Sequence, residues 1–220
     1  MRASDFFSVK AVPKLFWSAP YPLTIRPPLL SVVVLCFGLV IFGLGEALLI
    51  AAGMGVSPWT VFAQGVSLAA GWSVGTSTFL ISIAVLIFWI PLRQIPGIGT
   101  VLNAIIIALV IDLALPYLPR PDIMAAQVAL TVLGVGFIGF GSSVYLVSNL
   151  GPGARDGLMT GLQRRTGYPI MWVRIALEVL VVCIGWSLGG TVGFGTILFA
   201  LAIGPCISVT LHIFKLLFAR

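Results

Sequence analysis

An internal repeat limits the possible folds of this chain more than any other feature of its sequence. Shifting the sequence by 96 residues aligns residues 43–112 with residues 139–208 without a gap. Seven of the nine glycines in the first copy then fall on glycines in the second, where chance would give about two. Glycine is needed where backbones approach closely, so the repeat predicts a duplicated packing scaffold. The matching pairs are 43/139, 45/141, 55/151, 65/161, 71/167, 97/193 and 99/195.

The long apolar runs of each copy place the chain among helical membrane proteins. Hydrophobic residues make up 60% of the sequence, charged residues only 8%, and the mean hydropathy is +1.16. A soluble domain carries about 25% charged residues. The runs are about 20 residues long and do not alternate as β-barrel strands do. The net charge of +6 is what basic cytoplasmic loops give to a membrane protein, so it does not indicate nucleic-acid binding. The three cysteines lie in apolar runs without metal-ligand spacing, and we expect neither a metal nor another cofactor.

Each copy is predicted to contain three membrane spans and one short helix, which gives an all-α membrane protein with six spans. The short helices, residues 57–70 and 153–166, are about 21 Å long and too short to cross a bilayer core of about 30 Å. We therefore expect them to be interfacial or re-entrant. The predicted spans are residues 29–52, 74–92, 98–118, 125–148, 170–188 and 194–217.

The odd number of spans in each copy determines how the two copies lie in the membrane. Two consecutive three-span repeats enter the bilayer from opposite sides, which predicts an inverted repeat. With the N-terminus in the cytoplasm, ten of the twelve basic residues fall on the inner side and Arg120 alone on the outer side, as the positive-inside rule requires. Residues 1–28 form a basic, Pro-rich cytoplasmic segment, either on the membrane surface or disordered. Residues 29–118 and 119–220 are the two repeats of one membrane domain.

Several sequence blocks resemble a family of bacterial membrane proteins. The blocks GLGEALLIAAGMGVSPWTVFAQG, PGIGTVLNAIIIALVIDL, GPGARDGLMTGLQRRTG and VGFGTILFALAIGP are similar to the YczE-like family, which is related to the YitT group. The resemblance covers residues 30–212. It implies a multi-pass protein of the bacterial cytoplasmic membrane and carries no biochemical activity with it. The distribution of basic residues over six spans predicts that both termini lie inside. Family members often have Asp where this chain has Thr60, so the resemblance implies an acidic pair of which only Asp156 remains here.

Two ionisable residues lie four positions apart within the fifth predicted span. Arg174 and Glu178 share one face of that helix and lie about 9 and 15 Å from its start. Charges at such depth are costly and usually face the helix bundle or a wet cavity. They are either a structural pair that neutralises itself, or a site in which Arg174 binds substrate while Glu178 or Glu46 exchanges protons.

The remaining candidate residues lie in the first span, the third span and the second short helix. Glu46 lies between Gly45 and Ala47 and has no partner on its own helix, so it either pairs with Arg174 or carries a proton. Asn103 is a candidate for helix packing or for ligand contact. Arg155 and Asp156 begin a short helix, where they serve as cap and dipole partners or as part of a gate or site.

The function that these features favour is transport of a small polar solute, anionic or zwitterionic, with proton coupling through Glu46 or Glu178. Two short helices at matching positions of two inverted halves are typical of transporter binding sites. No Walker A, HExxH, nucleophile-elbow or CxxC motif is present, so we do not expect an enzyme. Six spans are few for a transporter, which favours a homodimer or an energising partner subunit. The alternative is a membrane scaffold or regulator that assists another envelope system.

Overall fold

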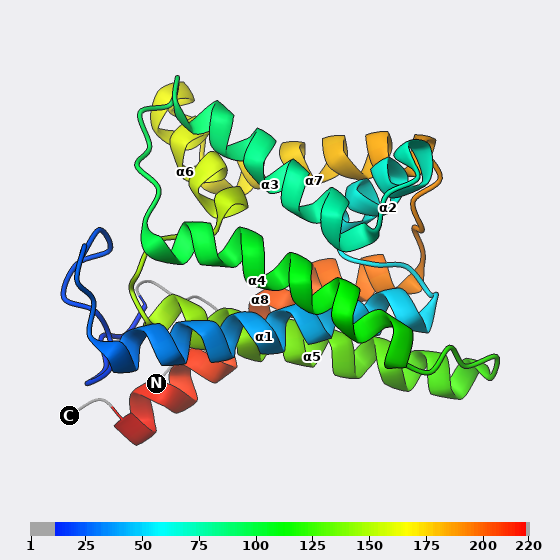
Figure 1. Cartoon of the computed structure of the whole chain (residues 1–220), viewed down its shortest axis with the longest axis horizontal. Helices are drawn as coiled ribbons and strands as arrows, with labels where there is room; N and C mark the ends of the chain where they lie inside the picture. Colours follow the sequence, from blue (N-terminus) through cyan, green and yellow to red (C-terminus); the bar gives the residue numbers. More distant parts are fainter. Residues whose placement is uncertain (1–11, 219–220) are drawn as a thin grey trace.

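The computed structural model describes residues 12–218, whose regular secondary structure is entirely helical. Figure 1 shows the helices in two layers. The lower layer in this view contains α1 (Leu29–Ala52), α4 (Ile98–Ala114), α5 (Met124–Val147) and α8 (Phe194–Phe218). The upper layer contains α2 (Pro58–Ala70), α3 (Val74–Trp89), α6 (Ala154–Thr166) and α7 (Ile170–Ser187). A short 3-10 helix, η2 (Leu115–Tyr117), extends α4.

Five of these helices are long and apolar enough to cross a membrane. They are α1, α4 together with η2, α5, α7 and α8, with lengths of 18 to 25 residues. A sixth span is formed if α2 and α3, which meet at a bend of 111°, are counted as one. The predicted all-helical membrane fold is therefore confirmed, with five to six spans in residues 12–218.

The third apolar helix is shorter than the sequence predicts. A span over residues 74–92 was expected, but α3 ends at Trp89 after 16 residues. Pro91 follows within two residues and has no N–H to continue the helical hydrogen bonds. The chain then turns through Arg93, which has a positive φ of 52°. As a result, α3 is about 24 Å long, short for a crossing on its own, and its bend of 111° with α2 makes the pair either a broken span or a re-entrant loop.

Glycine and proline set the limits of the two short helices. Pro58 occupies the first turn of α2, where its missing N–H has no helical partner in any case. Gly71 and Gly167 end α2 and α6 in the left-handed conformation, with φ of 71° and 75°. Both helices have 13 residues, so the two predicted short helices are present at matching positions of the repeat.

The two copies of the repeat exchange matching contacts at opposite ends of the lower layer. The Gly195 N–H donates to the Met54 carbonyl over 2.8 Å, and the Gly99 N–H donates to the Leu150 carbonyl over 2.8 Å. A shift of 96 residues converts one bond into the other. A Cβ on Gly195 would overlap the Gly55 carbonyl oxygen. The matched glycines are therefore required because loop and helix backbones touch at these two points.

The pairing of α3 with α4 has no counterpart in the second copy. A Cβ on Gly75 would overlap the Ala108 carbonyl oxygen, so α3 lies directly against α4. Asp112 then caps α3 by accepting hydrogen bonds from the Ser73 hydroxyl (2.5 Å) and the Gly75 N–H (2.8 Å). Met171 and Ser208 occupy the equivalent positions in the second copy.

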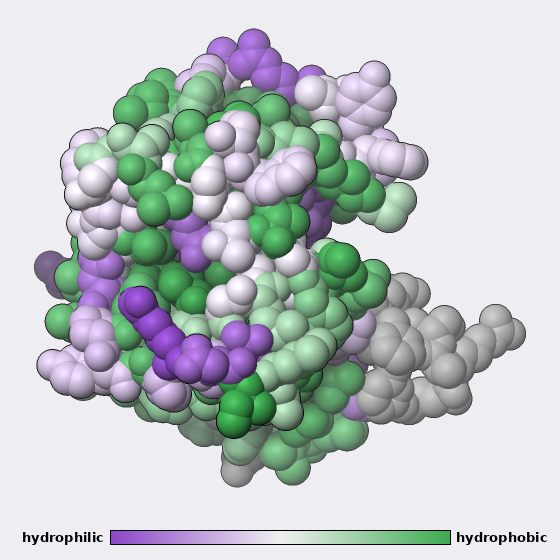
Figure 2. Space-filling view, turned by 90° about the vertical axis from the view of Figure 1, so that its right-hand side faces the viewer, coloured by the Kyte–Doolittle hydropathy of each residue, from purple (hydrophilic) through white to green (hydrophobic). Residues whose placement is uncertain are grey.

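Met171 has a side chain where Gly75 has none, and Ser208 has a hydroxyl where Asp112 has a carboxylate. The second copy therefore lacks the close approach and the helix cap that attach α3 to α4 in the first. Accordingly, α7 does not pack along α8 within the described residues. Figure 2 shows an indentation in the surface on the side of the molecule where these two helices lie. The second copy is therefore more open than the first.

Residues 12–28, which precede α1, pack against the rest of the protein. The Ala19 N–H donates to the Ser148 carbonyl (2.9 Å), and the Asn149 side chain donates to the Ala19 carbonyl (2.8 Å). Leu15 and Ala19 are buried. Of the two alternatives for this segment, disorder is therefore wrong for residues 12–28, which pack against the end of α5. The basic residues Arg2, Lys10 and Arg220 lie outside the described residues.

Candidate functional site

A cavity of about 240 Å³ lies between the two layers. Its lining includes residues from all eight α-helices. The volume is below the range of about 300–1,000 Å³ that is typical of pockets for drug-sized ligands. The cavity therefore suits a small solute.

The first residues of both short helices line this cavity. Ser57, Pro58 and Trp59 come from the start of α2, and Gly153 and Arg155 from the start of α6. The first N–H groups of a helix have no partner within the helix. Aligned peptide dipoles also place partial positive charge at this end. The cavity therefore receives the positive ends of two helices, one from each copy of the repeat.

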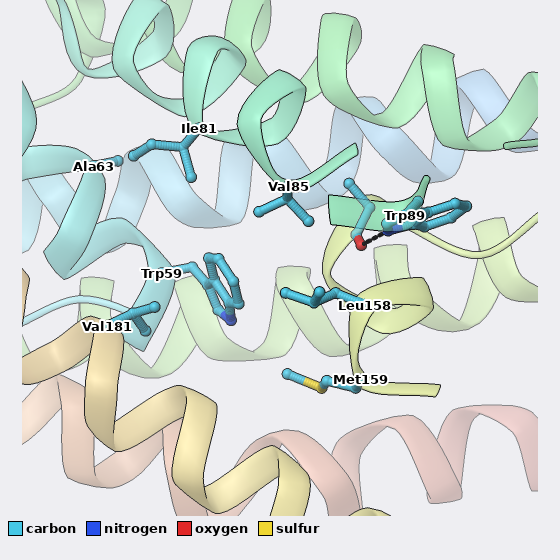
Figure 3. Close-up of a cluster of buried hydrophobic side chains, with 9 residues drawn as sticks. Trp59, Ala63, Ile81, Val85, Trp89, Leu158, Met159 and Val181 are labelled. Carbon is cyan, nitrogen blue, oxygen red and sulfur yellow. Dashed lines mark hydrogen bonds between the residues drawn. The ribbon is translucent and has the colours of Figure 1, made fainter. Parts of the chain in front are cut away.

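Trp59 contributes a buried hydrogen-bond donor without a partner. The residue is 6% exposed, and its Nε1 makes no hydrogen bond within the described part of the chain. Figure 3 shows the indole in the apolar cluster between α2, α3, α6 and α7, with its nitrogen on the side of the ring away from Ile81 and Val85. By contrast, Trp89 in the same cluster donates from Nε1 to the Ala154 carbonyl (2.9 Å).

Two arginines supply most of the donors in the cavity. The Arg155 guanidinium lies 5.3 Å from the centre of the Trp59 ring, in the range of a cation–π contact. None of its nitrogens forms a hydrogen bond or a salt bridge with residues 12–218. Arg174 donates from Nε to Glu178 Oε1 over 2.8 Å. The predicted pairing of Arg174 with Glu178 is thus present, and both residues line the cavity.

The Arg174 side chain is 48% exposed and that of Glu178 is 20% exposed. An exposed pair of this kind contributes only about 0–1 kcal/mol in water. The pair is therefore weak evidence for a stabilising role, and Arg174 keeps both terminal nitrogens available to a ligand.

The two copies each contain a carboxylate that accepts hydrogen bonds from hydroxyl groups, but in opposite positions. In the first copy the carboxylate is on the long helix α1. Glu46 accepts hydrogen bonds from the hydroxyl of Ser57, which immediately precedes α2 (2.9 Å), and from the hydroxyl of Thr60 within α2 (2.8 Å). In the second copy the carboxylate is on the short helix: Asp156 accepts from the Tyr145 hydroxyl of α5 over 2.9 Å. Each short helix is thus attached to the preceding long helix by a carboxylate–hydroxyl bond.

Glu46 lies behind the cavity wall and interacts with a different arginine from the one expected. It is 1% exposed and does not line the cavity, whereas its partner Ser57 does. The expected pairing with Arg174 is wrong, because Arg174 is bonded to Glu178. Instead, Arg155 is close enough to interact electrostatically with both Glu46 and Asp156.

The six residues selected from the sequence therefore come together around one cavity. Five of them line it directly, namely Asn103, Arg155, Asp156, Arg174 and Glu178. The amide of Asn103 lies beside Gly153 at the start of α6. Sequence reasoning missed Trp59 and Tyr145. The repeat carried a signal for Tyr145, since Leu49 occupies the equivalent position in the first copy and a Tyr hydroxyl inside a span needs a partner.

Comparison with known proteins identifies relatives of the same size. Residues 29–212 match a family described as a family of unknown function (DUF6198). An uncharacterized protein of Haemophilus influenzae is 39% identical over 93% of both chains. The uncharacterized membrane protein YczE of Bacillus subtilis is 35% identical over 76% of this chain and 79% of its own. The uncharacterized protein YyaS of the same organism is 28% identical over 73% and 82%. No solved structure matches the chain.

Proposed function

The chain belongs to this family of unknown function (DUF6198), and from its site we propose a membrane transporter for a small anionic or zwitterionic solute. The observation that carries the proposal is the cavity into which the starts of α2 and α6 both point. In many transporters, short or interrupted helices direct their N-termini at an anionic group of the substrate near the bilayer midplane. Arg155 and Arg174 add two cations with unused donors to this arrangement.

An inverted arrangement of the two copies is part of the proposal. The reciprocal bonds Gly195–Met54 and Gly99–Leu150 support it. When the first unit contacts the second and the second makes the equivalent contact with the first, a two-fold axis relates the two units. These contacts lie at opposite ends of α1 and α5, so such an axis runs across the long helices and in the plane of a membrane that they span.

Labelling of single cysteines tests the inverted topology. Ala70 and Thr166 are equivalent residues, 96 positions apart, and both are exposed at the ends of α2 and α6. In a chain whose three native cysteines are replaced by serine, Ala70→Cys is expected to react with a membrane-impermeant maleimide in intact cells. Thr166→Cys is expected to react only after the cells are opened. Labelling of both positions from the same side contradicts an inverted repeat.

Transport itself is tested with purified protein in liposomes that are preloaded with an unlabelled solute. We expect entry of radiolabelled solute by exchange for at least one member of a set of L-amino acids and short-chain carboxylates. Arg155→Met is expected to reduce exchange at low solute concentration about tenfold to a hundredfold, because a hydrogen bond to a charged group contributes about 1.5–3 kcal/mol.

Arg165→Met is the matched control, because Arg165 lies outside the cavity and donates to the Pro91 carbonyl (2.8 Å). It is expected to leave exchange unchanged. The absence of exchange for every solute, with folded protein in the liposomes, contradicts transport and favours the membrane scaffold or regulator. Equal exchange by the Arg155→Met protein contradicts the assignment of the site.

A further inference from the structure

We propose that the ligand of this cavity is a small zwitterion with one carboxylate and one ammonium group, as in an α-amino acid. This inference rests on the proposed transport function and specifies its substrate class. The carboxylate is held by Arg155, Arg174 and the Trp59 indole N–H. The ammonium group is held by Asp156 and Glu178.

The first argument is the surplus of hydrogen-bond donors. A guanidinium has five N–H donors, and within residues 12–218 Arg155 uses none of them, while Arg174 uses only Nε. The Trp59 Nε1–H is buried at the same cavity without an acceptor. Buried donors are rarely left unpaired in native proteins. The buried Trp59 donor therefore indicates an acceptor that the ligand brings, and the unused guanidinium donors of Arg155 and Arg174 lie at the same cavity, where they can share this acceptor.

The position of this acceptor is close to Tyr145. The Tyr145 hydroxyl is near enough to Arg155, Arg174 and Asp156 to interact electrostatically with all three. Its proton is already donated to Asp156. A carboxylate at this place has donors from both copies of the repeat within reach, and arginine pairs with two-oxygen anions through two parallel N–H groups.

The second argument is the presence of unused acceptors. Asp156 accepts the Tyr145 bond at Oδ2, and Glu178 accepts the Arg174 bond at Oε1. The other oxygen of each carboxylate has no donor within the described residues. Carboxylates are acceptors only when ionised, and an ammonium group has three donors. An ammonium group on the ligand satisfies these oxygens, which a simple anion does not.

The third argument is charge balance. Two arginines and two carboxylates line the cavity, so their charges cancel, and Glu46 lies directly behind Ser57. A simple anion adds an uncompensated negative charge to this partly buried space, which is unfavourable. A zwitterion leaves the net charge unchanged and places each of its groups beside the opposite charge. The balance therefore favours a zwitterion over phosphate or a monocarboxylate.

Thermal unfolding of the purified full-length protein tests this ligand class. The probes are glycine and L-alanine, compared at equal concentration with glycinamide, propionate and inorganic phosphate. We expect the two amino acids to raise the unfolding midpoint, since a ligand that binds only the folded state stabilises it. Glycinamide lacks the carboxylate and propionate lacks the ammonium group, so neither is expected to raise it comparably.

Trp59→Phe tests the assignment of the carboxylate, with Trp17→Phe as its control. Both tryptophans have a buried Nε1 without a partner, but only Trp59 lines the cavity. Trp59→Phe is expected to weaken alanine binding about tenfold or more, the usual effect of losing a hydrogen bond to a charged group. Trp17→Phe is expected to leave the affinity unchanged. Equal effects of the two substitutions overturn the role of Trp59.

Asp156→Asn tests the assignment of the ammonium group. The variant keeps an oxygen that accepts from Tyr145 but removes one negative charge. It is expected to weaken alanine binding about tenfold and to strengthen propionate binding, so the preference for a zwitterion shrinks. A loss of both affinities in the same proportion overturns the assignment.

The outcomes for the ligand class and for transport are separate. Stabilisation by propionate or phosphate equal to that by alanine, or no stabilisation by either amino acid, overturns the zwitterion. Exchange of a simple anion in liposomes then still supports transport. Binding of alanine without exchange of any solute supports the ligand class and contradicts the transport function.

Discussion

The Gly55→Ala protein is expected to be severely destabilised, although the substitution adds a single methyl group. Gly55 has a φ of +102°, and a Cβ there would lie 2.5 Å from the Gly193 nitrogen, a backbone atom that no side-chain movement can displace. Backbone strain and overpacking each cost about 1–3 kcal/mol. Together they are comparable with much of the total stability of about 5–15 kcal/mol that is typical of a folded domain.

The measurement is the unfolding midpoint in detergent, together with the amount of protein in the membrane. Gly53→Ala is the matched control: Gly53 also has a positive φ of +69°, but no atom lies within 4 Å of a Cβ placed there. This variant has the milder strain of the left-handed region, which an L residue can adopt, and no collision, so it is expected to lose much less stability. Equal losses for Gly53→Ala and Gly55→Ala would show that contact between the repeats is not the cause.

The helices were predictable from the sequence because each boundary has a local cause. The apolar runs define the long helices, Pro58 begins α2, and glycines in the left-handed conformation end both short helices. The repeat was visible for a related reason. Gly55, Gly99 and Gly195 are required by contacts between backbones, so the same residue type recurs at a fixed interval in the chain.

The openness of the second copy was not predictable from local sequence. It results from Met171 opposite Gly75 in the repeat, and from Ser208 opposite Asp112. A methionine near the start of an apolar helix is unremarkable alone, since it fits a lipid-facing or a packed position equally well. Its effect appears only when Gly75 is seen in contact with Ala108 and Asp112.

The composition of the site was predictable, but its pairing was not. Charged residues inside the spans are few, so Arg174 and Glu178 were candidates on cost alone, whereas Arg155 was a candidate because it begins a short helix. Which carboxylate faces which arginine depends on where the packing of α6 on α3, α4 and α7 places it relative to α1 and α5, and helix periodicity carries no information on this. Of the two alternatives for Glu46, a pair with Arg174 is therefore wrong, and the proximity of Glu46 to Arg155 emerged only in three dimensions.

Glu46→Gln is expected to abolish proton-driven accumulation of solute while leaving the fold and solute exchange intact. A glutamine oxygen still accepts from Ser57 or Thr60, and its amide group can donate to the other hydroxyl, so the contacts of α1 with α2 are kept. The group that can gain or lose a proton is removed. Glu46 is suited to coupling because it is buried behind Ser57 at the cavity and interacts with Arg155, a proposed ligand contact.

The measurement is uptake into liposomes with an imposed pH gradient. A gradient of one pH unit supplies about 1.4 kcal/mol per proton, which supports about tenfold accumulation. The unaltered protein is expected to approach this ratio, whereas Glu46→Gln equilibrates the solute at equal concentrations and retains exchange. Asp112→Asn is the control: this carboxylate caps α3, outside the cavity lining, and its loss should lower stability without affecting accumulation. Accumulation by the Glu46→Gln protein would make Glu46 a structural residue and move the search for coupling to Glu178 and Asp156, the carboxylates that line the cavity.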